Sequence, residues 1–280
     1  MFKYSATQWI YGAEPLAASF ERLHRFGYDG IELAGEPEQL DREEIKRLME
    51  RYGLICSSIC GIYKPERDLS SSDRAVRANA IAYVKSCVDL AVDTGAAVVI
   101  AVPSPVGKSA PGSSAHEEWN HAAASLREAG EYAASRGIRL AIEALNRFET
   151  YLVNKLEVAK KLVEEVSVSS VGIMADLFHM NIEERNPCQA IRNIADHLVH
   201  VHIADNTREA AGLGITDFES VLRTLLEVGY KGPLTMEFLP PVSNPYAAAS
   251  MKAEDRTIFD EFTRQSIDHM KALERKIALG

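Results

Sequence analysis

The chain has 280 residues, of which 46% are hydrophobic and 25% are charged, and its formal net charge at pH 7 is −9. This composition is that of a globular protein with a large core, and it excludes a mainly disordered chain. The acidic balance offers no basic surface to a nucleic acid, so we expect no nucleic-acid partner.

Apolar strand-like runs alternate with amphipathic helical runs along the whole chain. We predict eight strands, at residues 4–9, 31–34, 54–60, 97–102, 140–144, 171–176, 198–203 and 234–238. We predict a helix after each strand, at about residues 15–26, 41–52, 73–94, 117–136, 155–166, 187–197, 217–228 and 254–279. This alternation predicts an α/β fold, a (β/α)8 TIM barrel forming a single domain over residues 1–280, with a C-terminal helix at about 254–279.

The alternative to a barrel is a doubly wound open sheet. Such a sheet usually has fewer strands and a glycine-rich phosphate turn after the first strand. Neither a GxGxxG pattern nor a P-loop follows the first predicted strand here. The sequence therefore favours the barrel.

Several helix boundaries are marked by residues with known end preferences. Asp41 is a good N-cap, and Gly27, Gly137 and Gly229 suit the left-handed position that ends a helix. The Pro/Gly/Ser-rich segment 103–116 is too long for a minimal connection, and loops of this length are often lids or disordered excursions. We leave its role open.

The ends of the sequence and its cysteines predict a cytoplasmic protein. The N-terminus lacks a basic start with a long apolar core, and no run approaches eighteen apolar residues, so we expect neither a signal peptide nor a membrane span. The cysteines are too sparse for a disulfide framework, and we expect all of them to be reduced: Cys56, Cys60, Cys87 and Cys188.

The last four predicted strands each carry a potential metal ligand near the C-terminal end. These residues are Glu143, Asp176, His202 and Glu237. A single strand-end carboxylate often only caps the next helix, but four ligands on successive barrel strands can surround one point. Three carboxylates and one imidazole favour Mn²⁺, Mg²⁺ or Co²⁺ over zinc, which more often recruits cysteine or several histidines.

Further polar residues lie near these strand ends. Glu149, His179 and Arg208 follow the ligands closely enough to reach over the barrel mouth, although each could also be an ordinary surface residue. We expect Glu32, at the end of the second strand, to face the mouth as a fifth carboxylate with a weaker claim. We expect His200 to be a buried structural residue.

A hard cation ringed by carboxylates suits a substrate that chelates through adjacent oxygens, such as a ketose. The cation would polarise the carbonyl, and a carboxylate would remove the neighbouring proton to give an enediolate. Glu143 and Glu237, on the outer strands of the arc, are placed to act on two faces of the substrate, while Asp176 and His202 would mainly hold the cation. Residue types alone do not separate epimerisation from aldose–ketose isomerisation.

Four motifs carry a resemblance to a known family. They are EALNRFE at 143–149, D-x-F-H-M-N-I-E-E at 176–184, H-I-x-x-N-x-R at 202–208 and M-E-F at 236–238. In these the sequence resembles the ketose 3-epimerases of the D-tagatose and D-psicose 3-epimerase group, within the xylose isomerase-like TIM barrels. The resemblance extends over essentially the whole predicted barrel.

The resemblance implies a metal held by Glu143, Asp176, His202 and Glu237, with the two glutamates as the acid–base pair. It places Glu149, His179 and Arg208 on the substrate oxygens near C1 to C3. It also implies Mn²⁺ as the first choice of cation, with Co²⁺ or Mg²⁺ as alternatives, a ketose of four to six carbons as substrate, and a homodimer or homotetramer.

Two segments depart from the family pattern. The sequence reads Gly212-Leu-Gly-Ile-Thr where the family usually has Gly-x-Gly followed by His or Glu, and Leu239-Pro-Pro follows Glu237. We expect these segments to alter the part of the pocket that receives the distal end of the sugar.

Three rival interpretations remain open. One is an aldose–ketose or keto-acid isomerase of the same superfamily, and another is an apurinic-site endonuclease, which would need further histidine and aspartate ligands and a basic face. The third, outside enzymes, is a sugar-binding barrel without activity.

Overall fold

The computed structural model describes residues 2–240 and 256–279. Its eight strands form one closed, all-parallel barrel in which each strand pairs with its neighbour in the chain and β1 pairs with β8. The strands are β1 Tyr4–Thr7, β2 Gly30–Gly35, β3 Ile55–Gly61, β4 Val98–Ala101, β5 Arg139–Glu143, β6 Val171–Asp176, β7 Leu198–Ile203 and β8 Leu234–Met236. The predicted fold is confirmed.

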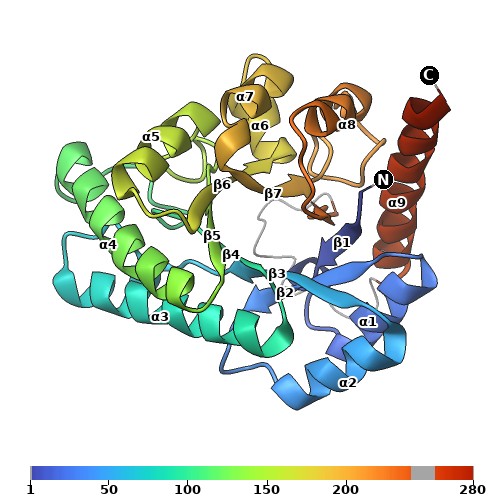
Figure 1. Ribbon diagram of the computed structural model, residues 1–280, viewed down its shortest axis with the longest axis horizontal. Helices are drawn as coiled ribbons and strands as arrows, with labels where there is room; N and C mark the ends of the chain where they lie inside the picture. The colour runs from blue at the N-terminus through green and yellow to red at the C-terminus, as the bar shows by residue number, and fades with distance from the viewer. Residues whose placement is uncertain (1, 241–255, 280) are drawn as a thin grey trace.

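Helices surround the barrel, as Figure 1 shows. Those within the described residues are α1 Leu16–Arg25, α2 Arg42–Tyr52, α3 Arg74–Thr94, α4 Ala115–Ser135, α5 Leu156–Val166, α6 Leu177–Glu183, α7 Pro187–Asn193, α8 Phe218–Glu227 and α9 Arg256–Leu279. The predicted start of the last helix, at residues 254 and 255, lies outside the described residues. No helix in the described ranges is long and apolar enough to span a membrane.

The predicted helix ends follow the expected chemistry. Asp41 caps α2 by accepting from the backbone N–H groups of Glu43 and Glu44. Gly27, Gly137 and Gly229 all have positive φ values, between 72° and 75°. These are backbone conformations that favour glycine, and they turn the chain from each helix back toward the next strand.

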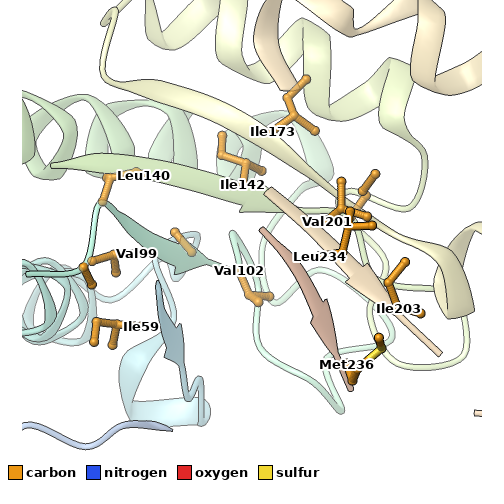
Figure 2. Close-up of a cluster of buried hydrophobic side chains, with 14 of the residues drawn as sticks. Ile59, Val99, Val102, Leu140, Ile142, Ile173, Val201, Ile203, Leu234 and Met236 are labelled. Atoms are coloured by element: carbon orange, nitrogen blue, oxygen red, sulfur yellow. The ribbon is translucent and has the colours of Figure 1, made fainter. Parts of the chain in front are cut away.

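The alternation of side chains along the strands separates an apolar layer from a polar interior. In β5, Leu140 and Ile142 belong to the large buried cluster between strands and helices, whereas Ala141 belongs to a small cluster inside the barrel. Figure 2 shows part of the large cluster, with Val201 and Ile203 of β7 near the side chains of β8. Because successive strand residues point to opposite faces, the residues between these apolar positions face the barrel interior.

The structure differs from the predicted elements in three places. The first strand ends at Thr7 and is followed by a 3₁₀ turn, Gln8–Tyr11. A short helix that the sequence analysis missed, α6, starts directly from β6. The helix predicted at 187–197 is α7 followed by a separate 3₁₀ turn, Ala195–His197.

The long segment after β4 is held to neighbouring loops by hydrogen bonds and an ion pair. Ser104 hydrogen-bonds to Thr150 at 2.6 Å, and the Gly107 N–H donates to the carbonyl of Glu149 at 2.7 Å. The Lys108 ammonium lies 2.7 Å from Asp68 Oδ2. This segment therefore packs against the loop after β5.

Candidate active site

The four predicted ligands meet at the C-terminal ends of β5 to β8. Glu143 is the last residue of β5, Asp176 the last of β6, His202 lies in β7, and Glu237 directly follows β8. Each offers one ligand atom, and these four atoms lie within 4.8 Å of one another. All four side chains are buried. The barrel thus brings together residues that are up to 94 positions apart in the sequence.

The hydrogen-bond pattern leaves two buried atoms of this cluster without partners. Asp176 caps α6 with Oδ1, which accepts from the N–H groups of Phe178 and His179, but its Oδ2 has no partner among the described residues. His202 Nδ1 is also unpartnered there and lies 3.7 Å from Asp176 Oδ2 and 3.5 Å from Glu237 Oε2. Buried lone pairs facing one point are those that a cation would satisfy.

The electrostatics of the cluster also favour a bound cation. Burial, together with the charges of Glu237 and Asp176, raises the pKa of the Glu143 carboxyl well above its usual value. Burial alone would raise the pKa of Asp176, but the neighbouring His179 and His202 lower it. Three carboxylates this close repel one another, so a divalent cation would suit the donor set better than protons or water.

The three further predicted residues border the same point. Arg208 Nη1 lies 3.1 Å from Glu149 Oε1, and its Nη2 lies 3.4 Å from Glu237 Oε2. His179 Nε2 lies 3.7 Å from Glu143 Oε1 and 3.9 Å from Asp176 Oδ2. The predicted site residues are therefore all neighbours, while their roles stay predictions.

The orientation of His179 is fixed by a residue that the sequence analysis did not single out. Asn146 donates to His179 Nδ1 through its backbone N–H, at 3.2 Å, and its side-chain amide lies 2.9 Å from the same atom. An Nδ1 atom that accepts leaves the ring proton on Nε2, which faces the ligand cluster. The Asn146 amide also donates to Glu149 Oε1 at 3.0 Å, which links the two side chains.

Arg208 adopts a conformation that is rare outside glycine. Its φ is 66°, and such backbone strain often occurs at functional sites. Its N–H donates to the carbonyl of Asp205, and its own carbonyl accepts from the N–H of Leu239. The guanidinium lies 4.7 Å from the ring centroid of Phe178, a cation–π distance that holds it over the mouth.

A cavity of about 780 Å³ opens beside the cluster. Glu143, Glu149, His179, Arg208 and Glu237 line it on the side of β5 to β8. Much of the remaining lining comes from the segments after β1, β2 and β3, from positions within residues 12–16, 36–40 and 61–65. Asp176 and His202 are not among its lining residues.

The departing segment at 212–216 is not among the described residues that line this cavity, and its effect on the distal part of the pocket stays a prediction. The carboxylate of Asp205 instead accepts hydrogen bonds from the N–H groups of Gly212, Gly214 and Thr216. These bonds hold the segment against the start of the loop that follows β7. Leu239 and Pro240 also lie outside the lining, and Pro241 is beyond the described residues.

Glu32 is not at the mouth, which corrects the sequence analysis. It is the third residue of the six-residue strand β2, its side chain is fully buried, and it lies against His200 and His202. His200 is buried, as predicted, and its Nε2 lies 3.0 Å from Glu32 Oε2. The alternation of side chains along β2 could have predicted that Glu32 faces the barrel interior.

Trp9 is a second neighbour that the sequence did not reveal. It lies in the 3₁₀ turn after β1, and its Nε1–H donates to Glu237 Oε1 at 3.1 Å. The contact depends on barrel closure, because β1 pairs with β8. Glu237 Oε1 thus accepts the hydrogen bond from Trp9, while Oε2 faces His202 and Arg208.

A family model described as "Xylose isomerase-like TIM barrel" matches residues 20–271. The chain belongs to this family. Among curated members, it is 30% identical over 214 residues to an L-ribulose 3-epimerase of Methylomonas sp. (strain DH-1), a match that covers 76% of this chain and 74% of the relative. It is also 30% identical over 226 residues to a D-psicose 3-epimerase of Ruminiclostridium cellulolyticum, covering 78% of this chain and 76% of the relative.

A solved structure supports the same fold in three dimensions. The D-allulose 3-epimerase from Methylomonas sp., determined in complex with D-allulose, superposes with a TM-score of 0.86 at 26% identity. The superposition covers 97% of this chain and 96% of that one. These relatives are epimerases, and this family member is an enzyme of the isomerase class.

Proposed function

We propose that the enzyme inverts C3 of a free ketose, of the tagatose, fructose, psicose or ribulose type, by proton transfer between two glutamates. The observation that carries the proposal is the cluster at the ends of β5 to β8. Three buried carboxylates and one imidazole have ligand atoms within 4.8 Å, beside a cavity that two of the carboxylates also line. The ketose 3-epimerase names of the relatives support the substrate class.

Glu143, Asp176, His202 and Glu237 would hold one divalent cation, for which the unpartnered Asp176 Oδ2 and His202 Nδ1 are suited. When bound, this cation supplies Lewis acidity, which polarises the ketose carbonyl and acidifies the adjacent C–H. We propose Mn²⁺ as the cation, with Co²⁺ or Mg²⁺ as alternatives, because the donor set is dominated by carboxylate oxygens.

The lining of the cavity supports a division of roles among the four residues. Glu143 and Glu237 line it and can reach a substrate carbon, whereas Asp176 and His202 lie behind them. Glu143 comes from β5 and Glu237 follows β8, so their carboxylates approach from different sides of the cluster. One would remove the C3 proton and the other would return a proton to the opposite face. Because the reaction is reversible, each glutamate serves as base for one epimer and as acid for the other.

Glu149, His179 and Arg208 would position the substrate oxygens near C1 to C3. His179 Nε2 and Arg208 Nε are buried donors without hydrogen-bond partners in the described part of the chain, and so are available to a substrate oxygen. Glu149 is held by Arg208 and Asn146, and it offers an acceptor to a sugar hydroxyl. A ring of fixed donors and acceptors restricts the bound ketose to one reactive orientation.

The charges around the cavity disfavour a keto-acid substrate. Its lining includes one arginine and one lysine among the described residues, and both are paired with carboxylates. Arg208 contacts Glu149 and Glu237, and Lys64 lies 3.6 Å from Glu36. A substrate carboxylate would have to displace one of these glutamates, which makes an uncharged sugar the better fit.

We also propose that the whole chain forms one domain and acts as a homodimer or homotetramer, in keeping with the resemblance.

The function is tested by incubating the Mn²⁺-loaded enzyme with D-fructose and with D-tagatose and separating the products. A C3 epimer of the added ketose is the expected product. An aldose product would show isomerisation instead, and no conversion of any four- to six-carbon ketose would reject the proposed chemistry.

A further inference from the structure

A second group of buried polar side chains lies directly beneath the four proposed ligands. It consists of Glu32 of β2, Ser58 of β3, and His200 and His202 of β7, all of which are fully buried. His202 belongs to both groups. The proposed function gives Glu32, Ser58 and His200 no role.

The two ring nitrogens of His202 face different surroundings. Nε2 lies 3.1 Å from Glu32 Oε1 and hydrogen-bonds to Glu32 Oε2 at 3.2 Å. Nδ1 faces Asp176 and Glu237 and has no hydrogen-bond partner in residues 2–240 and 256–279. The ring therefore spans from the buried carboxylate to the ligand cluster.

This contact determines which nitrogen carries the proton of a neutral His202. An ionised carboxylate only accepts hydrogen bonds, so Nε2 must donate to Glu32. In the neutral ring, Nδ1 then keeps its lone pair, which is directed at the ligand cluster. With the proton on Nδ1 instead, the ring would present an N–H to a cation and could not bind it.

Glu32 is itself held firmly in place. Its Oε2 accepts from the Ser58 hydroxyl at 2.5 Å and from His200 Nε2 at 3.0 Å, in addition to His202. Three donors on one oxygen fix the carboxylate and leave it little freedom to turn away from His202. Ser58 and His200 therefore hold Glu32 in place, and Glu32 in turn holds His202.

We propose that Glu32 is a positioning residue that fixes His202 in the Nε2-protonated form, so that Nδ1 is the atom that binds the cation. The proposal rests on the metal site of the proposed function. Glu32 is not among the described residues that line the cavity, so we assign it no part in proton transfer. Loss of a partner of this kind typically weakens metal binding by about 10- to 100-fold.

The test is the Mn²⁺ affinity of purified protein after chelator treatment, measured by isothermal titration calorimetry. In Glu32→Gln, the amide can donate to Nε2 as well as accept from it, so the Nδ1-protonated form of His202 becomes accessible. We expect Mn²⁺ to bind about 10- to 100-fold more weakly to this variant than to wild type. Affinity within threefold of wild type would overturn the proposal.

Glu118→Gln is the matched control. Glu118 is also a buried glutamate, but its carboxylate contacts Lys108, Tyr151 and backbone N–H groups instead of a proposed ligand. We expect this variant to bind Mn²⁺ within threefold of wild type even if its thermal stability falls. A loss equal to that of Glu32→Gln would mean that any buried charge supports the site, and the proposal would fail.

A second measurement uses the unmodified protein and does not depend on the folding of a variant. In ¹⁵N-histidine-labelled protein saturated with diamagnetic Mg²⁺, His202 should show a protonated Nε2 and an unprotonated Nδ1, assigned by comparison with His202→Gln. A protonated Nδ1 in the wild type would refute the proposal. If the wild type binds neither Mn²⁺ nor Mg²⁺, the proposed metal site itself is wrong, which is a different outcome from an unchanged Glu32→Gln.

Discussion

Two buried acidic clusters lie on the same face of the barrel and differ in one respect. In the first, Glu118 and Asp68 share the ammonium of Lys108, at 2.5 and 2.7 Å. In the second, Glu143, Asp176 and Glu237 surround a point to which the described chain brings a histidine but no lysine. Within residues 2–240 and 256–279, the first cluster has an ammonium group at its centre, whereas in the second the Arg208 guanidinium lies 3.4 Å from one carboxylate, that of Glu237.

The difference appears in one carboxyl of each cluster, Glu118 in the first and Glu143 in the second. Burial raises the pKa of Glu118, but hydrogen bonds from Lys108 and Tyr151 outweigh it, and the pKa falls below its usual value. The pKa of Glu143 is raised, because burial is reinforced by the charges of Glu237 and Asp176. The first cluster is therefore satisfied internally and fastens the segment after β4. In the second, the described residues supply no ammonium group, which supports the proposal that this cluster binds a cation from solution.

Metal removal separates the two clusters most strongly. After treatment with a chelator we expect no measurable turnover, because the second cluster loses its charge compensation while the first is unaffected. Added Mn²⁺ should restore turnover and raise the melting temperature, since a ligand at 100 times its Kd adds about 2.7 kcal/mol of stability. Turnover by metal-free protein, verified by elemental analysis, would contradict this expectation.

Glu143→Gln and Glu237→Gln remove the two carboxylates that line the cavity. Each should lower kcat by about 10²–10⁴-fold, the usual contribution of positioned proton transfer, without unfolding the barrel. Steady-state assays with circular dichroism as the folding check provide the measurement. Glu118→Gln, from the other cluster, should keep near-normal kcat. Near-normal activity in either of the first two variants would disprove the two-base mechanism.

Lys108→Met removes the internal cation of the first cluster. Leaving buried carboxylates unpaired should lower the free energy of unfolding by about 3 kcal/mol, at the low end of such losses because the Lys108 side chain is 16% exposed. Urea unfolding measures this change, and Mn²⁺ affinity should stay within threefold of wild type. If stability were unchanged, the fastening role assigned to this cluster would be withdrawn.

The smallest effect concerns pH. Because the folded-state pKa of Glu118 lies below the unfolded value, its contribution to stability is complete above pH 4.5 and is lost as the pH falls through the folded pKa. Wild type should therefore lose more stability than Glu118→Gln between pH 4.5 and 3. Between pH 7 and 5, the stability difference between the two proteins should be constant. Parallel urea titrations at these pH values make the comparison, and equal acid sensitivity of both would contradict it.

The sequence predicted the barrel and the four strand-end residues because both depend on local patterns. Apolar runs of strand length and glycine helix ends place the elements, and the ends of parallel strands meet at one edge of a barrel. Asp176 illustrates the limit of this reasoning. It was predicted as a ligand against the alternative of a helix cap, and the structure shows the cap at Oδ1 and, within the described chain, an unpartnered Oδ2 that is free for the proposed cation.

The contacts beneath and beside the cluster were not predictable in the same way. Glu32 and His202 are 170 positions apart, and their contact depends on the side-chain direction and register of strands that are not adjacent. Trp9 reaches Glu237 because the chain turns into a 3₁₀ helix after β1, where a continuing strand was expected. Such contacts follow from packing across the barrel, which no local pattern encodes.

The central claim is that the enzyme removes a proton at C3 of a ketose and returns one to the other face. The most direct measurement is to run the Mn²⁺-loaded enzyme with D-fructose in ²H₂O and locate the label in the products by NMR. We predict a C3 epimer that carries deuterium at C3. Deuterium at C1 of an aldose product, or an epimer that retains the original hydrogen at C3, would contradict the account.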